Sequence, residues 1–261
     1  MLQLITILNR CHRFPGFVYQ QAGFSTDHKS IEIAVRPRKG SAAVCSRCHQ
    51  SAPGYDQLPE RRFEFIPFWG FLVFLLYSMR RVDCRRCEAV VVEEVPWGDG
   101  KHQLTTTYMQ FLASWAKVLS WTDVAKRFQT SWEKVFNAVE HVVDWGLQNR
   151  CLDGITAIGV DEIQWKKNHN YLTLVYQINK GSVRLLWIGK ERTRETFSKF
   201  FDMLGDSRSD LIEYVCSDMW KPYCKSSRSA SVTRSIYWTA FTLSPGSTRL
   251  LMKFALESID E

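Results

Sequence analysis

The stretch ITAIGVDEIQWKKNHNYLTLVYQINKGSVRLLWIG, residues 155–189, decides how the second half of the chain folds. It contains three apolar runs that are rich in β-branched and aromatic residues, a composition typical of strands. The letters NKG at 179–181 predict a hairpin turn between the second and third runs. An amphipathic helix over 194–205 and a fourth strand over 211–217 follow, so the predicted order of elements is β-β-β-α-β.

Two aspartates stand where strands of this half are predicted to end. Asp161 closes the first run, and Asp218 follows the strand predicted over 211–217. If those two strands are parallel neighbours, both carboxylates meet at one edge of the sheet, where they can share divalent metal ions. Such a site needs at least one further carboxylate. The alternative interpretation is that both aspartates are solvated strand ends with no function.

The first half carries two CxxC pairs, VCSRCH with Cys45 and Cys48 and VDCRRCE with Cys84 and Cys87. Each pair places two thiolates on one tight turn, and two pairs complete a tetrahedral site with no open position for chemistry. We therefore predict a structural Zn²⁺ ion; the alternative is four reduced cysteines without metal. In a chain of 261 residues this pattern also favours a reducing compartment over a disulfide framework.

Arginines lie next to both cysteine pairs. Guanidinium groups on a rigid metal module suit bidentate contacts to phosphate, and a formal charge of +7 favours an anionic partner such as nucleic acid. A solvated basic turn is the alternative interpretation. The candidate phosphate-binding residues are Arg47, Arg80, Arg81, Arg85 and Arg86.

The middle of the chain changes to a helical pattern. WTDVAKRFQTSWEKVFNAV, residues 121–139, is similar to a helix-turn-helix, in which Thr122 caps the first helix and the second helix begins near Thr130 or Ser131. The turn has Gln129 and Thr130 where a glycine is usual, and an ordinary antiparallel helix pair is the alternative. The residues predicted to contact DNA are Lys126, Arg127, Ser131, Trp132 and Lys134.

The longest uncharged apolar run, FIPFWGFLVFLLY at 65–77, predicts a pair of buried strands. It is shorter than the ~18 to 20 residues of a spanning helix and is interrupted by Pro67 and Gly70. The N-terminus has neither the basic region nor the cleavage site of a secretory signal. We therefore expect no membrane partner and a cytoplasmic location.

These motifs follow one another in a characteristic order: four cysteines, a helix-turn-helix, GVDE at 159–162 with a hairpin after it, and VCSDMWKPY at 215–223. In this order the chain resembles the bacterial insertion-sequence transposases of the ISL-three family, from about residue 30 to 224. The stretches GVDEIQWKKNHNYLTLVYQI and SDMWKPY carry the most specific part of the resemblance.

The resemblance implies an RNase H-like catalytic domain whose DDE triad uses Mg²⁺ or Mn²⁺ to cut and join DNA strands. Asp161 and Asp218 match the first two triad positions. It further implies that the partner is double-stranded DNA at the terminal inverted repeats of a transposon, that the protein is associated with the bacterial nucleoid, and that a homo-oligomer can form on DNA. No residue matches the context of the third acidic residue, a glutamate, so we assign none and expect this chain to be catalytically inactive.

The sequence after residue 224 differs from the continuation that the family implies. The codons of residues 234–258 can also be read in a shifted frame, in which each new codon takes the last base of one codon and the first two bases of the next. With a permitted choice of synonymous codons, this frame encodes LDILDRFHIVARINKTLDEVRAGE. Two letters are independent of codon choice: Trp238–Thr239 gives Asp, and Met252–Lys253 gives Glu. We therefore predict a frameshift near 221–225, which would leave a catalytic sheet that ends at its fourth strand.

The predicted fold is a multidomain α+β protein. Its expected parts are an N-terminal strand-containing segment, a four-cysteine zinc module, a helical helix-turn-helix domain, an incomplete RNase H-like α/β domain and a non-homologous tail, over 1–42, 43–100, 101–150, 151–224 and 225–261. Two other functions are kept as alternatives. One is a protein that only binds DNA and regulates or inhibits transposition, and the other is a metal-dependent nuclease of DNA repair.

Overall fold

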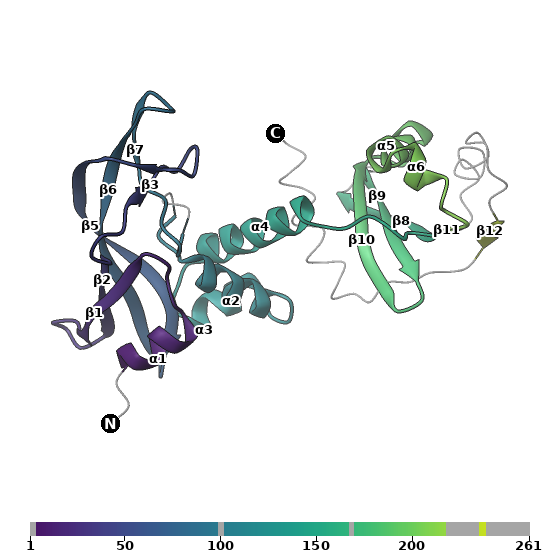
Figure 1. The fold of residues 1–261 in the computed structure, drawn as a ribbon. Coiled ribbons are helices and arrows are strands. Elements are labelled where there is room, and N and C mark those ends of the chain that lie inside the picture. The colour runs from purple at the N-terminus through teal and green to yellow at the C-terminus, as the bar shows by residue number, and fades with distance from the viewer. Residues whose placement is uncertain (1–3, 99–101, 167–169, 218–234, 239–261) are drawn as a thin grey trace. The chain divides into compact units, whose positions relative to one another are not determined.

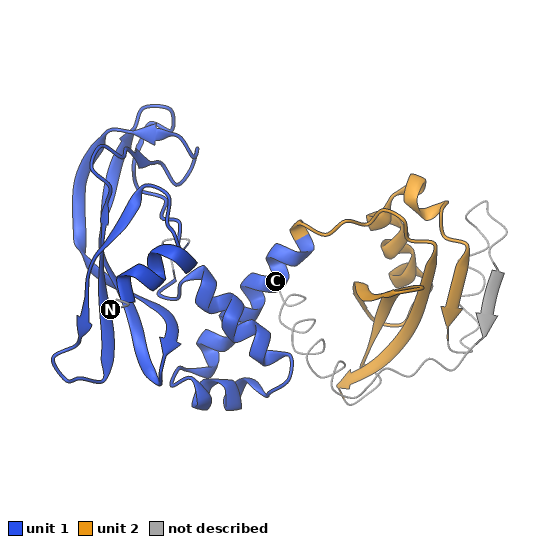
Figure 2. Cartoon of the chain, turned by 60° about the horizontal axis from the view of Figure 1, so that its bottom comes forward, with its two compact units in different colours: residues 1–147 blue, residues 148–261 orange. Residues whose placement is uncertain are grey.

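The computed structural model describes residues 4–98, 102–166 and 170–217, and the backbone of 235–238 (Figure 1). The chain divides into two compact units, residues 1–147 and 148–261 (Figure 2). Asp218, Cys224 and most of the predicted tail lie outside the described residues. Among the helices that the structure describes, none is long and apolar enough to cross a membrane.

In the described part of the first unit, five strands form one sheet. Its main path is β1-β2-β6-β5, with β7 also paired to β6. β2 is parallel to β6, and the other pairs are antiparallel. Strands from the predicted N-terminal segment and from the predicted zinc module therefore share one sheet. The elements are α1 Leu4–Cys11, β1 Phe17–Phe24, β2 Ser30–Pro37, β3 Ala43–Val44, β4 Ser51–Ala52, β5 Gly54–Phe68, β6 Phe71–Cys84 and β7 Ala89–Val92, of which β3 and β4 form a separate short pair.

The apolar run at 65–77 forms the adjoining ends of β5 and β6, so the predicted pair of strands is confirmed. Trp69 and Gly70 make the turn between them, with φ of 51° and 85°. Two successive residues in the left-handed region match the turn type that joins tightly paired antiparallel strands. Behind this hairpin the core of the sheet is aromatic, and Trp97 is its largest fully buried side chain.

Three helices complete the first unit: α2 Thr106–Ala116, α3 Trp121–Arg127 and α4 Trp132–Gln148. The Ser120 hydroxyl accepts a hydrogen bond from the Asp123 amide at 3.2 Å and donates one to the Asp123 carboxylate at 2.6 Å. Ser120 therefore caps α3, and the predicted cap, Thr122, lies in the first turn of the helix. The prediction was wrong by two positions because Trp121 already belongs to the helix and packs inward.

Residues 128–131 separate α3 from α4. Gln129 has φ of 53°, so it adopts the left-handed conformation for which a glycine is usual in such a turn. The Ser131 hydroxyl accepts a hydrogen bond from the Lys134 amide at 3.3 Å, which agrees with the predicted start of the second helix. Val124 of α3 and Val135 of α4 are fully buried.

The second unit also contains a five-stranded sheet among its described residues, in the order β10-β9-β8-β11-β12. β8, β9 and β10 are antiparallel neighbours, whereas β11 is parallel to β8 and to β12. The predicted β-β-β-α-β order is present, including the turn after Asn179. The elements are β8 Ala157–Lys166, β9 Asn170–Asn179, β10 Ser182–Lys190, α5 Arg194–Leu204, α6 Asp206–Ser209, β11 Tyr214–Ser217 and β12 Ser235–Trp238.

Two predictions for this sheet need correction. β8 continues past Asp161 to Lys166, so Asp161 lies inside the strand and not at its end. The extra residues pair with β9, and Ile163 and Trp165 pack on an apolar cluster of that strand. In addition, β12 adds a strand beside β11, where the sequence predicted a sheet that ends at its fourth strand.

α5 covers one face of this sheet. Its Phe197 and Phe200 are fully buried in a cluster with Ile158, Val160 and Val215 of the strands. Asp161 points to the opposite face, because neighbouring residues of a strand alternate between the two faces. α5 therefore packs on one face of β8, and the Asp161 side chain lies on the opposite face of the strand.

Candidate functional site

The four cysteines of the two CxxC pairs meet in space. Their Sγ atoms lie within 4.8 Å of one another, with 3.9 Å between Cys45 and Cys87 and 3.6 Å between Cys48 and Cys84. A tetrahedron with metal–sulfur bonds of about 2.3 Å has sulfur–sulfur edges of about 3.8 Å. The cluster therefore has the size of a four-thiolate metal site of the kind that holds Zn²⁺.

Backbone amides favour the thiolate form at one corner of this cluster. The amides of Cys48 and Arg47 lower the pKa of Cys45 to about 6, and the Arg47 amide lies 3.4 Å from the Cys45 sulfur. Burial raises the pKa of Cys87 to about 12. A metal ion binds thiolates and displaces the remaining protons, so the donor set and its amides fit a cation.

Apolar side chains pack around the cysteines. The buried residues Ala43, Val82 and Val91 form a cluster with Cys45 and Cys84. β6 ends at Cys84, and β7 begins at Ala89 and pairs back onto β6. A site held between packed strands in this way suits a structural role.

Three of the predicted phosphate-binding arginines are exposed on the cysteine turns. Arg47, Arg85 and Arg86 form no ion pair with residues that the structure describes. Arg81 is only partly exposed and binds the carboxylate of Asp56 in a bidentate pair. Arg47, Arg85 and Arg86 are therefore the most available to an anionic partner.

Arg80 has a different environment from its neighbours. Its guanidinium binds the carboxylate of Glu93 through Nε at 2.8 Å and Nη2 at 2.6 Å, and its backbone amide donates to the same carboxylate at 2.7 Å. The Tyr77 hydroxyl donates to Glu93 as well, and the Glu93 side chain is 0% exposed. Arg80 therefore neutralises a buried carboxylate inside the first unit.

The residues predicted to contact DNA from the helices lie around the start of α4. Lys126 and Arg127 are exposed at the end of α3, and Trp132 is 50% exposed. Lys134 instead forms an ion pair with Glu64 of β5. Because Glu64 is largely buried, this pair ties the start of α4 to the sheet of the same unit.

Asp161 is half-buried on β8, where it pairs with Leu174 of β9. Its Oδ1 accepts a hydrogen bond from the Glu162 amide at 2.8 Å. β11 is parallel to β8, and its last pair joins Ser217 to Val160, the residue before Asp161. The parallel arrangement on which the hypothesis of shared metal ions depends is therefore present, while Asp218 lies outside the described residues.

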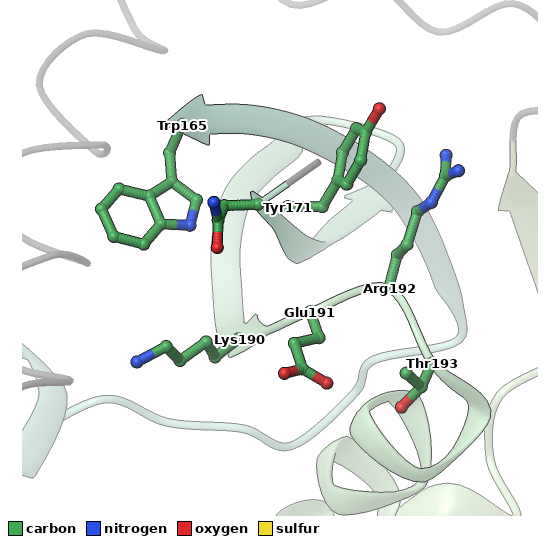
Figure 3. Close-up of a pocket in the computed structure, with 7 residues that line it drawn as sticks. Trp165, Tyr171, Lys190, Glu191, Arg192 and Thr193 are labelled. Carbon is green, nitrogen blue, oxygen red and sulfur yellow. The ribbon is translucent and has the colours of Figure 1, made fainter. Parts of the chain in front are cut away.

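A pocket that the sequence did not predict lies between the β8–β9 hairpin and the start of α5 (Figure 3). Its signal in the sequence is weak, because one tryptophan and a short charged run, GKERTR at 189–194, are common in solvated loops. Only the pairing of β8, β9 and β10 brings these segments together. The lining residues are Trp165, Asn170, Tyr171, Lys190, Glu191, Arg192 and Thr193.

The chain is similar to known transposases over most of its described length. The transposase for insertion sequence element IS1557 of Mycobacterium tuberculosis is 32% identical over 196 residues, which cover 74% of this chain and 43% of that protein. The transposase for IS1001 of Bordetella parapertussis is 24% identical over 195 residues, 75% of this chain and 47% of that protein. The chain thus spans about half the length of the curated relatives it matches.

A family model of the ISL-three transposases with a DDE domain, described as "Transposase", matches residues 158–236. The chain belongs to the ISL-three transposase family. The family match begins within β8 and includes Asp161, and it continues past residue 224, where the resemblance was expected to end. The matched ISL-three region thus ends within β12, at residue 236.

Among solved structures, this ISL-three transposase chain matches one described as a simian T-cell lymphotropic virus intasome in complex with PP2A regulatory subunit B56 gamma. The sequence identity is 12% and the TM-score is 0.28, and the match covers 51% of this chain and 52% of the other. The family assignment depends on the sequence matches alone.

Proposed function

We propose that this chain binds the double-stranded DNA ends of a bacterial insertion sequence through its first unit. The observation that carries the proposal is the convergence of the four cysteine sulfurs within 4.8 Å. A structural Zn²⁺ ion bound there would hold together the two turns that bear Arg47, Arg85 and Arg86. The ion would fix the backbone turns from which these guanidinium groups can make bidentate contacts to phosphate.

The helices supply the second part of the proposed DNA-binding surface. In helix-turn-helix proteins the second helix enters the major groove and contacts bases with its N-terminal residues. In this chain those residues are Ser131 and Trp132, with Lys126 and Arg127 exposed on the preceding helix. Lys134 is proposed to act indirectly, because its ion pair with Glu64 orients α4.

Replacing Arg85 and Arg86 together with alanine tests the proposal. We expect weaker binding to a duplex that carries the terminal inverted repeat of the element. The slope of log K against log salt should also fall by about 1.8, about 0.9 for each lost phosphate contact. Fluorescence anisotropy at several salt concentrations measures both quantities.

The matched control is Arg10→Ala with Arg13→Ala, which removes the same charge from exposed positions outside the cysteine turns. It should leave the salt slope close to that of the unmodified chain. Equal losses in the two double variants would mean that binding depends on net charge alone, and the proposed surface would then be rejected.

We propose further that Asp161 and Asp218 are two of the carboxylates that hold Mg²⁺ or Mn²⁺ in an RNase H-like domain. The β-β-β-α-β order and the parallel pair of β8 and β11 support this proposal. Bound metal ions would supply activation of the attacking hydroxyl and stabilisation of the leaving oxygen of a phosphodiester. The hydrogen bond from the Glu162 amide holds the Asp161 carboxylate in one orientation.

We expect no strand cleavage by this chain alone, because no acidic residue of 225–261 matches the context of the third triad member. An assay with DNA ends and Mg²⁺ or Mn²⁺ measures this. Cleavage that is abolished by Asp161→Ala but kept by Asp202→Ala, an exposed aspartate of α5, would overturn the expectation.

The second candidate function is a protein that only binds DNA and regulates or inhibits transposition. It is favoured by the position of all the candidate DNA contacts in the first compact unit. Residues 1–150 alone should then bind the transposon end with the affinity of the whole chain. A large loss of affinity in this fragment would instead show that the second unit contributes to binding.

A further inference from the structure

The pocket beside α5 combines an aromatic face with positive charge. It has a volume of about 310 Å³, and Figure 3 shows Trp165 and Lys190 on one side of it and Tyr171 and Arg192 on the other. The Lys166 ammonium lies 5.7 Å from the centre of the Trp165 ring. Lys190 is exposed and forms no ion pair with any residue in the described ranges.

Apart from the two lysines, the charged groups in and beside the pocket largely neutralise one another. Arg192 forms an ion pair with Glu162 at 3.2 Å and stacks over the Tyr171 ring, with 4.2 Å from its Cζ to the ring centre. Glu191 is the acidic residue of the lining, and Glu162 lies next to the pocket as the partner of Arg192. The three cations Lys166, Lys190 and Arg192 outnumber the carboxylates of Glu162 and Glu191 in and beside the pocket, which leaves a net positive charge.

The pocket lies at the C-terminal ends of β8 and β10, beyond Asp161 along β8. β8 and β10 are both antiparallel to β9, so their C-terminal ends lie together. Trp165 follows Asp161 by four residues on β8, about 13 Å along the strand. A separation of that size is on the order of a few nucleotides along a DNA strand.

We propose that this pocket binds one unpaired nucleotide of the DNA strand that the second unit engages. The inference rests on the proposed function, because it assumes a DNA strand that passes Asp161 and continues toward the C-terminal end of β8. The base stacks on Trp165, and Lys190 binds an adjacent phosphate. The nucleotide has to be unpaired, because a base within a duplex is covered on both faces by its neighbours.

The chemistry of the lining favours a nucleotide over other ligands. Stacking of a base on an aromatic side chain next to a cation is the usual way in which proteins hold single strands. A volume of about 310 Å³ is at the lower end for ligand pockets, so it suits a ligand as small as one nucleotide. Since every base has an aromatic face, the pocket should accept all four bases.

Binding of a fluorescein-labelled single strand of about 12 thymidines to the full chain tests the proposal. Trp165→Ala should weaken this binding by about 5- to 160-fold, the effect of losing one stacked base. Lys190→Ala should lower the salt slope by about 0.7, the value for one phosphate contact on a single strand. Lys180→Ala, an exposed lysine in the β9–β10 turn, is the matched control and should change neither quantity.

Because Trp165 also packs on β9, two conservative variants separate stacking from folding. Trp165→Phe should retain single-strand affinity within a few-fold, whereas Trp165→Leu should lose as much as Trp165→Ala. In addition, 2-aminopurine placed in the strand should be quenched by the unmodified chain and by Trp165→Phe, but not by Trp165→Leu. Equal affinities and equal quenching for the phenylalanine and leucine variants would overturn the proposal.

Binding to a fully paired duplex, measured on the same proteins, distinguishes this inference from the proposed function. If duplex binding depends on Arg85 and Arg86 while Trp165→Leu leaves single-strand binding unchanged, the pocket is rejected and the proposed function stands. If duplex binding is absent while single-strand binding depends on Trp165, the proposed function of the first unit fails and the pocket stands.

Discussion

Replacing Cys84 with serine is expected to remove the metal from the first unit and to abolish its binding to transposon-end DNA. Cys84 is buried at the end of β6, and its sulfur lies 3.6 Å from that of Cys48. Structural Zn²⁺ binding in small zinc domains contributes about 10–16 kcal/mol at neutral pH. Loss of one thiolate should therefore release the turns that carry the exposed arginines.

Zinc content by mass spectrometry, thermal unfolding and duplex affinity measure the three parts of this prediction. Cys151→Ser is the control, because Cys151 is an exposed cysteine of the other unit and should leave all three unchanged. A chelator should reproduce the effect of Cys84→Ser on the unmodified chain. Retention of stoichiometric zinc and of DNA affinity in Cys84→Ser would refute the structural role of the metal.

The cysteine cluster could be predicted from the sequence because its geometry is mostly local. A CxxC turn brings two sulfurs together whatever the rest of the chain does, so only the meeting of the two turns depends on the fold. The β-β-β-α-β order was predictable for a similar reason, since each strand and the helix carries its own periodicity.

The surroundings of single charged residues could not be predicted in the same way. Arg80 and Arg85 look alike in the sequence, but pairing of β6 with the segment after β7 puts Glu93 against Arg80 and leaves Arg85 exposed. Lys134 binds Glu64, a residue that is distant in the sequence. Such contacts depend on strand register, which composition and local spacing do not specify.

The length of β8 was mispredicted for a related reason. The letters EIQWK after Asp161 contain two charged residues and one amide, so they read as the end of a strand. Pairing with β9 and the packing of Ile163 and Trp165 outweigh that polarity. The pocket at Trp165 depends on the same long-range pairing and was missed with it.

Replacing Glu93 with glutamine is expected to lower the free energy of unfolding of the first unit by about 3 kcal/mol. Removing one partner of a buried ion pair costs about 3–5 kcal/mol, because the other charge is left uncompensated. The lower end of this energy range applies, because the side chain of Arg80 is still 17% exposed and water can partly solvate its charge. Urea unfolding followed by circular dichroism measures the change.

Glu94→Gln is the closest available control, because it makes the same chemical change at the next residue. Glu94 is exposed and pairs with the exposed His49 at 2.8 Å, and an exposed ion pair contributes little to stability. Tyr77→Phe removes only a neutral donor to Glu93 and should cost about 1–2 kcal/mol. If Glu93→Gln cost no more than Glu94→Gln, Arg80 would be free to leave its partner, and its place among the candidate phosphate contacts would be restored.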